Sequence, residues 1–270
     1  MSALHHTRIV AEGAQPSRWV LFLHGIFGSG ANWRTFARRW VERDPSWGAV
    51  LVDLRKHGAS QDLPPPHTVQ NAANDLIALE LPGPVEAVVG HSFGGKVALA
   101  YVEARRGDLS RAVILDSTPG ARPDHRGSES TLDVLAFLER VGPVPHRDAF
   151  VARGVDAGIS AGIGQWLAMN LERRGDAMVL KLDLDAVRAL LNDYFRIDLW
   201  EVLERPPGRV VFDVVLGGRS TVFDASERAK LQALAAAQPN RIRITELPNA
   251  GHWVHVDDPE GVARVLLQLP

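Results

Sequence analysis

The sequence predicts an α/β fold: a mostly parallel, doubly wound sheet interrupted by an inserted helical cap. Over most of the 270 residues, short apolar runs typical of buried strands alternate with helical patterns. The alternation stops across residues 119–204, where apolar residues recur at helical spacing without a convincing strand. Pro119 and the Pro206-Pro207-Gly208 cluster mark the ends of this stretch. We therefore expect a core of residues 1–118 and 205–270 and a helical cap of residues 119–204.

Seven runs are predicted to be strands, most of them because they are continuous and apolar, which is typical of strands buried on both faces. They are residues 7–10, 19–23, 49–54, 85–89, 111–115, 209–216 and 241–246. Helical patterns between them predict helices at residues 32–42, 68–79, 96–105 and 226–237. This order of elements is typical of a parallel sheet with helices on its faces.

The composition excludes several classes of function. The formal net charge is −2, so nothing in the charge favours nucleic acid or an anionic membrane as a partner. No apolar run approaches the roughly 18 residues that a spanning helix needs, and the first six residues lack the features of a signal peptide. The chain has no cysteine and no metal-ligand spacing. We expect a cytoplasmic protein without a membrane anchor, metal or other cofactor.

The most informative motif is Gly90-His91-Ser92-Phe93-Gly94, which matches G-x-S-x-G. It stands between a predicted strand and a predicted helix, and in that context the pattern indicates a nucleophile elbow. The flanking glycines allow the strand and the helix to approach more closely than a Cβ permits. Ser92 is therefore the predicted nucleophile.

The predicted base is His252, in the loop that follows the last predicted strand. Loops at the carboxyl ends of parallel strands meet at one edge of the sheet, where the elbow also lies. Imidazole suits the task because its ordinary pKa, near 6.5, lets it accept and return a proton near neutral pH. His255 is the alternative base, and a structural surface histidine is the alternative interpretation of His252.

The acid has two candidates. A carboxylate often follows the penultimate strand, but here that position reads Gly217-Gly218-Arg219-Ser220. Asp116, which ends the strand after the elbow helix, is the favoured acid, and Ser220 would donate a hydrogen bond into its network. Asp224 is the alternative, although it also suits a helix N-cap. A carboxylate that merely caps the start of the cap region is the alternative interpretation of Asp116.

The backbone N–H groups of Ile26 and Phe93 are the predicted oxyanion hole. His24-Gly25 ends a predicted strand, so the following residue is expected beside the elbow. Aromatic side chains near the reacting atoms are candidates for substrate binding, with core filling as the alternative; they are Phe27, Phe93, Trp253 and, in the cap, Trp166. His24 and the cluster at residues 53–60, which includes His57, are interpreted as structural.

With these motifs in order, the chain resembles the α/β-hydrolase superfamily over nearly its full length. More closely it resembles a branch of small capped esterases and thioesterases. That branch has H-G-x-F-G-S, D-x-R-x-H-G-x-S, G-H-S-x-G-G-K and G-G-x-S, which stand here at residues 24–29, 53–60, 90–96 and 217–220. The resemblance implies an acid after the strand that follows the elbow helix, which matches Asp116, with Ser220 in the histidine network.

These observations predict a serine hydrolase that cleaves esters or thioesters of small to medium acyl groups through an acyl-enzyme. The same triad also serves other reactions, because a fold does not fix a reaction. Alternatives are carbon–carbon bond hydrolysis, perhydrolysis or pyruvate elimination in menaquinone synthesis. A non-enzymatic receptor with a capped pocket and an interaction module are further alternatives. A small acyl ester or thioester is the expected partner.

Overall fold

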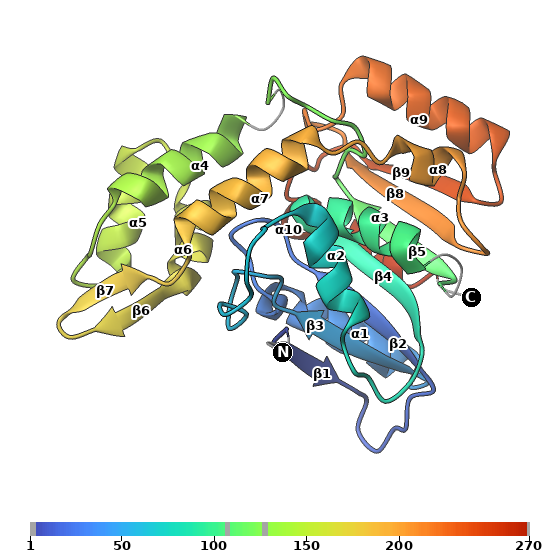
Figure 1. Ribbon diagram of the computed structural model, residues 1–270, viewed down its shortest axis with the longest axis horizontal. Helices are drawn as coiled ribbons and strands as arrows, with labels where there is room; N and C mark the ends of the chain where they lie inside the picture. The colour runs from blue at the N-terminus through green and yellow to red at the C-terminus, as the bar shows by residue number, and fades with distance from the viewer. Residues whose placement is uncertain (1–3, 106–108, 126–128, 269–270) are drawn as a thin grey trace.

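The computed structural model describes residues 4–105, 109–125 and 129–268 and is built on a seven-stranded sheet (Figure 1). The strand order is β1-β3-β2-β4-β5-β8-β9; β1 pairs antiparallel with β3, and all other neighbours are parallel. The strands are β1 (His6–Ile9), β2 (Arg18–Leu23), β3 (Trp47–Val52), β4 (Val85–His91), β5 (Arg111–Leu115), β8 (Val211–Gly217) and β9 (Ile242–Leu247). The predicted mostly parallel α/β sheet is confirmed.

The central strands are buried because helices cover both faces of the sheet. In β2, Leu21 and Leu23 pack in one hydrophobic core, while Val20 and Phe22 pack in the other. Successive side chains of a strand point to opposite faces, so a strand between two cores is apolar throughout. Helices α2 (Val69–Ile77) and α3 (Phe93–Arg105) contribute to the first core, and α1 (Arg34–Arg43) and α11 (Pro259–Leu266) to the second.

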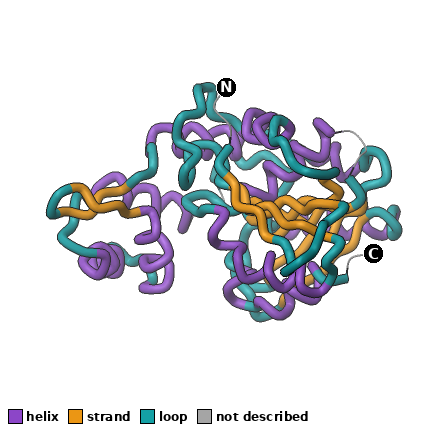
Figure 2. The backbone as a smooth tube through the Cα atoms, turned by 90° about the horizontal axis from the view of Figure 1, so that it is seen from below, coloured by secondary structure: helices purple, strands orange, loops and turns teal. Residues whose placement is uncertain are grey.

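Most of the segment between β5 and β8 projects away from the sheet (Figures 1 and 2), whereas its last helix packs against α3. It contains α4 (Glu129–Arg140), α5 (Arg147–Asp156), α6 (Ala161–Leu167), the 3-10 helix η2 (Ala168–Asn170), α7 (Leu184–Arg196) and α8 (Trp200–Glu204). The remaining helices are η1 (Gly30–Trp33), α9 (Ala225–Ala237) and α10 (Val254–Asp257). We refer to residues 119–204 as the cap.

The cap was predicted to be helical, but it also contains a β-hairpin. Strands β6 (Leu171–Arg174) and β7 (Ala177–Leu180) pair antiparallel and lie far from the central sheet in Figure 2. Each strand has only four residues and is partly exposed, so neither makes a buried apolar run. The sequence signal that was missed is the two-residue loop Gly175-Asp176, a pair typical of tight hairpin turns, in which Gly175 has a φ of 59°.

Lys96 of α3 joins the two ends of the cap to the core. Its buried ammonium donates hydrogen bonds to the carbonyl oxygen of Gly120 (2.8 Å), and to those of Tyr194 (2.8 Å) and Ile197 (3.2 Å) at the end of α7. The carbonyl end of a helix carries partial negative charge, which favours a cation there. Burial nevertheless lowers the pKa of Lys96 to about 7. The helix that begins directly after Ser92 thus also fixes the cap.

Among the described helices, none has the length and apolar character to cross a bilayer.

Candidate active site

Ser92 stands at the sharp turn between β4 and α3. Its φ is 53°, in the left-handed region that residues with a Cβ seldom adopt. The turn is possible because its neighbours are glycines: a Cβ on Gly90 would collide with the backbone of Gly94, and a Cβ on Gly94 with the backbone of β2. The Ser92 N–H donates to the Leu115 carbonyl oxygen at 3.0 Å, which ties the turn to β5.

Ser92, His252 and Asp116 form one hydrogen-bonded chain. His252 Nε2 lies 3.0 Å from Ser92 Oγ, and His252 Nδ1 lies 2.8 Å from Asp116 Oδ2. A carboxylate only accepts, so Nδ1 carries the ring proton and Nε2 is left to accept the Ser92 hydroxyl proton. This arrangement allows a serine to lose its proton to an imidazole as it attacks a carbonyl carbon.

Asp116 is fully buried and is held from three sides. Besides His252, it accepts hydrogen bonds from the Gly217 N–H at 3.0 Å and from the Ser220 hydroxyl at 2.6 Å. Ser220 therefore contacts the carboxylate directly. These donors stabilise the charged carboxylate in a site that water does not reach.

The alternative candidates lie elsewhere. Asp224 is the N-cap of α9: its side chain accepts from the Glu227 N–H at 2.9 Å, and the Glu227 side chain accepts from the Asp224 N–H at 3.2 Å. His255 packs against the rings of Trp33 and His91, with centroids 5.0 and 4.5 Å away, and burial lowers its pKa to about 4.

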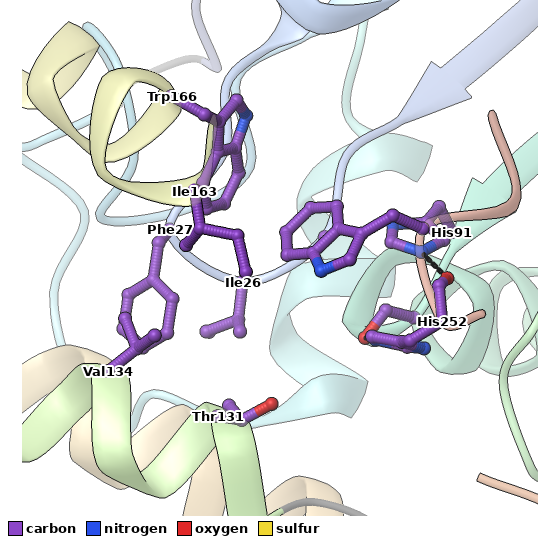
Figure 3. A pocket seen from close by; sticks show the side chains of 11 residues that line it. Ile26, Phe27, His91, Thr131, Val134, Ile163, Trp166 and His252 are labelled. Carbon is purple, nitrogen blue, oxygen red and sulfur yellow. Dashed lines mark hydrogen bonds between the residues drawn. The ribbon is translucent and has the colours of Figure 1, made fainter. Parts of the chain in front are cut away.

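His91 was missed by the sequence analysis, although it is the first variable position of G-x-S-x-G. Its Nε2–H donates to the His252 carbonyl oxygen at 2.9 Å (Figure 3), so the elbow itself holds the loop that carries His252. Burial keeps the pKa of His91 well below the ordinary value, so the ring stays neutral near pH 7. A neutral imidazole beside His252 adds no competing positive charge.

The loop after β2 lies against the elbow and is fixed at Phe27. The Phe27 N–H donates to His57 Nε2 at 3.2 Å, and Asn170 of the cap donates to the Phe27 carbonyl oxygen at 2.8 Å. Ile26, directly before Phe27, lines the space next to Ser92. Phe93 is the first residue of α3, so no carbonyl group of a preceding helical turn accepts its N–H. The predicted oxyanion role of the Ile26 and Phe93 amides stays a prediction.

His57 and its neighbours at residues 53–60 contact backbone groups rather than the reacting atoms. His57 Nδ1–H donates to the Arg55 carbonyl oxygen at 2.9 Å, and burial lowers the pKa of His57 to about 3, which keeps Nε2 an acceptor for Phe27. Asp53 accepts from the Gly30 N–H at 2.8 Å. This cluster is scaffolding for the loop that carries Ile26, which agrees with its structural interpretation. Asn170 gave no sequence signal because its partner is 143 residues away.

The free space around Ser92 is small. A cavity of about 30 Å³ lies between the core and the cap, and a second of about 10 Å³ also reaches Ser92 and is lined by Phe93 and Tyr194. Figure 3 shows Trp166 and Ile163 of the cap across the first cavity from His252. The predicted binding residues Phe27, Trp166 and Trp253 line the first cavity, and Phe93 lines the second.

Within the described parts of the chain, no group of three potential metal ligands occurs.

Because three histidines are fully buried, we expect acid to lower the stability of the folded protein. Burial lowers the pKa of His24 and His91 below the ordinary value of 6.5 and that of His57 to about 3, so below pH 6.5 the folded state takes up these protons less readily than the unfolded chain. The unfolded chain binds these protons in that range, so stability falls as the pH falls, by up to about 1.4 kcal/mol per pH unit for each histidine. We expect the free energy of unfolding to be lower at pH 5 than at pH 7 by at least about 2 kcal/mol, the contribution of His57 alone, with His24 and His91 adding to the loss.

Guanidinium titrations followed by circular dichroism at the two pH values measure this difference. Equal stability at pH 5 and pH 7 would contradict the expected neutral state of the three buried rings.

The family follows from comparison with known proteins. The profile of the "Alpha/beta hydrolase family" matches residues 20–265, and the chain therefore belongs to the α/β hydrolase family. It is 33% identical over 255 residues to the sn-1-specific diacylglycerol lipase ABHD11 of Mus musculus, covering 89% of this chain and 77% of that protein. It is 27% identical to 2-succinyl-6-hydroxy-2,4-cyclohexadiene-1-carboxylate synthase of Klebsiella pneumoniae subsp. pneumoniae, covering 96% of both.

Among solved structures, a marine microorganism esterase superposes with a TM-score of 0.79 at 21% identity, and the match covers 100% of each chain. At that identity the likeness concerns the fold alone. Together with the family match, it confirms the predicted α/β-hydrolase fold.

Proposed function

We propose that this protein is a serine hydrolase that cleaves carboxylic esters or thioesters of small to medium acyl groups. The observation that carries the proposal is the hydrogen-bonded chain from Ser92 Oγ through His252 to the buried Asp116. Family members named as a lipase and as an esterase support hydrolysis of an ester-type bond. The assignment to the branch of small capped esterases and thioesterases belongs to the same proposal.

In the proposed reaction, Ser92 Oγ attacks the acyl carbonyl carbon while His252 Nε2 takes the hydroxyl proton. Asp116 stabilises the resulting imidazolium, and the Ile26 and Phe93 N–H groups stabilise the negative charge on the carbonyl oxygen. The tetrahedral intermediate then expels the alcohol or thiol, which receives the proton from His252. Water, deprotonated by His252, attacks the acyl-enzyme, and the acid leaves as the serine proton is restored.

A panel of acyl esters of p-nitrophenol and matching coenzyme A thioesters tests this proposal, together with labelling by a fluorophosphonate. We expect hydrolysis of short acyl esters and covalent labelling at Ser92, because both need the same activated hydroxyl. Peptide mapping of the labelled protein identifies the modified residue. Absence of both hydrolysis and labelling would overturn the proposal.

A second candidate is the elimination reaction of the menaquinone pathway. It is favoured by the similarity to the Klebsiella synthase over nearly the whole of both chains. The two candidates differ in the bond that breaks, since elimination of pyruvate needs no acyl-enzyme. Turnover of the synthase's substrate, together with no activity toward any ester or thioester in the panel, would favour this candidate over hydrolysis.

A further inference from the structure

The site around Ser92 is too small for the substrates of an ester hydrolase as it stands. Its two cavities measure about 30 and 10 Å³. A cavity of roughly 150 Å³ is needed to hold a molecule as small as benzene, and about 10–15 Å³ already holds one water. Any acyl chain of more than a few atoms must therefore extend beyond these cavities.

A larger space begins directly behind the wall of the first cavity. This groove, which we call the outer groove, has a volume of about 280 Å³. Its lining residues are Ser160, Gly162, Ile163, Trp166, Trp253, Val256 and Asp257. Ile163, Trp166 and Trp253 also line the first cavity, so one layer of side chains separates the outer groove from the reacting atoms.

Two tryptophans meet in that layer, one from each part of the molecule. Trp166 comes from α6 of the cap, and Trp253 directly follows His252 in the core. Their rings are in edge-to-face contact, with centroids 4.7 Å apart and planes at 68°. Both side chains are only partly buried, so the indoles are not locked in a core.

The chemistry of the outer groove suits an uncharged hydrocarbon chain. Ile163, the two indoles and Val256, which is 64% exposed, present apolar surface. The two polar side chains are engaged with backbone: Asp257 accepts from the Gly251 N–H at 2.7 Å, and Ser160 caps α6 by accepting from the Ile163 N–H. No basic residue lines the groove, so nothing there would hold a phosphate or carboxylate.

We propose that the outer groove binds the hydrocarbon acyl chain of a medium-chain ester, and that Trp166 and Trp253 form the gate through which the chain passes from Ser92. This inference rests on the proposed function and adds a substrate class to it. It also names the residues that set chain-length preference, since a chain of ten carbons reaches the groove and a chain of two does not.

Gly162 offers a direct test, because it lines the outer groove and a Cβ on it would meet no atom within 4 Å. The variant Gly162→Trp should therefore fill the groove without disturbing the fold. The matched control is Ala161→Trp, the preceding residue of α6, which is exposed and does not line the groove. The measurement is kcat/KM for p-nitrophenyl decanoate divided by kcat/KM for p-nitrophenyl acetate.

We expect Gly162→Trp to lower this ratio about tenfold or more, the loss expected when two or more methylene groups are no longer buried. Ala161→Trp should keep the wild-type ratio. An unchanged ratio in Gly162→Trp, or a wild-type protein that hydrolyses acetate but not decanoate, would overturn the assignment of the groove while leaving the proposed function intact. A wild-type protein that hydrolyses neither ester and takes no fluorophosphonate label would instead overturn the proposed function itself.

Discussion

Replacement of Ser92 by alanine is expected to lower kcat for p-nitrophenyl acetate by about 10⁶-fold, the loss seen when a triad serine is removed. The physical reason is that, among the described residues, Ser92 has the only hydroxyl that is hydrogen-bonded to His252 Nε2. Some acceleration over water should remain, because the proposed oxyanion donors, the Ile26 and Phe93 amides, do not depend on the serine. Steady-state hydrolysis, corrected for the uncatalysed rate, measures the effect.

The same variant should lose fluorophosphonate labelling while keeping its fold. Alanine at position 92 retains the backbone turn, so the thermal unfolding midpoint should change little. Ser226→Ala, an exposed serine on α9, is the matched control and should keep both activity and labelling. If the Ser92→Ala protein hydrolyses the ester at a rate within about tenfold of the wild-type rate, a group other than Ser92 accepts the acyl group.

The core was predictable from sequence because its strands are buried on both faces. β3 and β5 are buried throughout, and such strands give continuous apolar runs whose ends are visible in the sequence. Each predicted strand therefore agrees with the observed one to within about two residues at both of its ends. The hairpin of β6 and β7 gave no such signal because each strand has only four residues, of which one is buried.

The candidate site also has a part that the sequence predicts and a part that it does not. Ser92 was predictable because the elbow is a local feature whose glycines and flanking elements stand together in the sequence. The contacts that support it are not local: the Ser92–His252 pair spans 160 residues, and the Asn170–Phe27 hydrogen bond spans 143. His91 was overlooked for a related reason, since its partner is a backbone carbonyl that no sequence pattern records. Such contacts depend on how loops pack, which periodicity does not encode.

The choice of acid illustrates how geometry separates candidates that sequence leaves open. Asp116 and Asp224 both follow a strand of the sheet, at β5 and β8, and both suit a carboxylate role by residue type alone. In the structure Asp116 lies 2.8 Å from His252 Nδ1, whereas Asp224 accepts from a backbone N–H of its own helix. The two residues therefore make a matched pair for the same substitution.

Asp116→Asn is expected to lower kcat by about 10⁴-fold, as in a serine protease whose triad aspartate is changed to asparagine. The Asn Oδ1 would still accept from the Gly217 N–H, so Nδ2 would face the imidazole. An amide N–H donates, and it would bind His252 Nδ1 in its unprotonated form, which places the ring proton on Nε2. That tautomer has no free electron pair toward Ser92 and cannot accept its proton. Kinetics with p-nitrophenyl acetate measure the loss.

Asp224→Asn is the control and should keep kcat and stability near wild type, because asparagine and aspartate are about equally good N-caps. Its contact with Glu227 is made through an oxygen that asparagine retains. The opposite pattern, with Asp224→Asn inactive and Asp116→Asn active, would assign the orienting carboxylate to the loop after β8. If Asp116→Asn does not fold, the decisive measurement is the His252 Nδ1 proton resonance of the wild type in NMR. The hydrogen bond to Asp116 should shift it far downfield, and a wild type without such a resonance would contradict the assignment of Asp116.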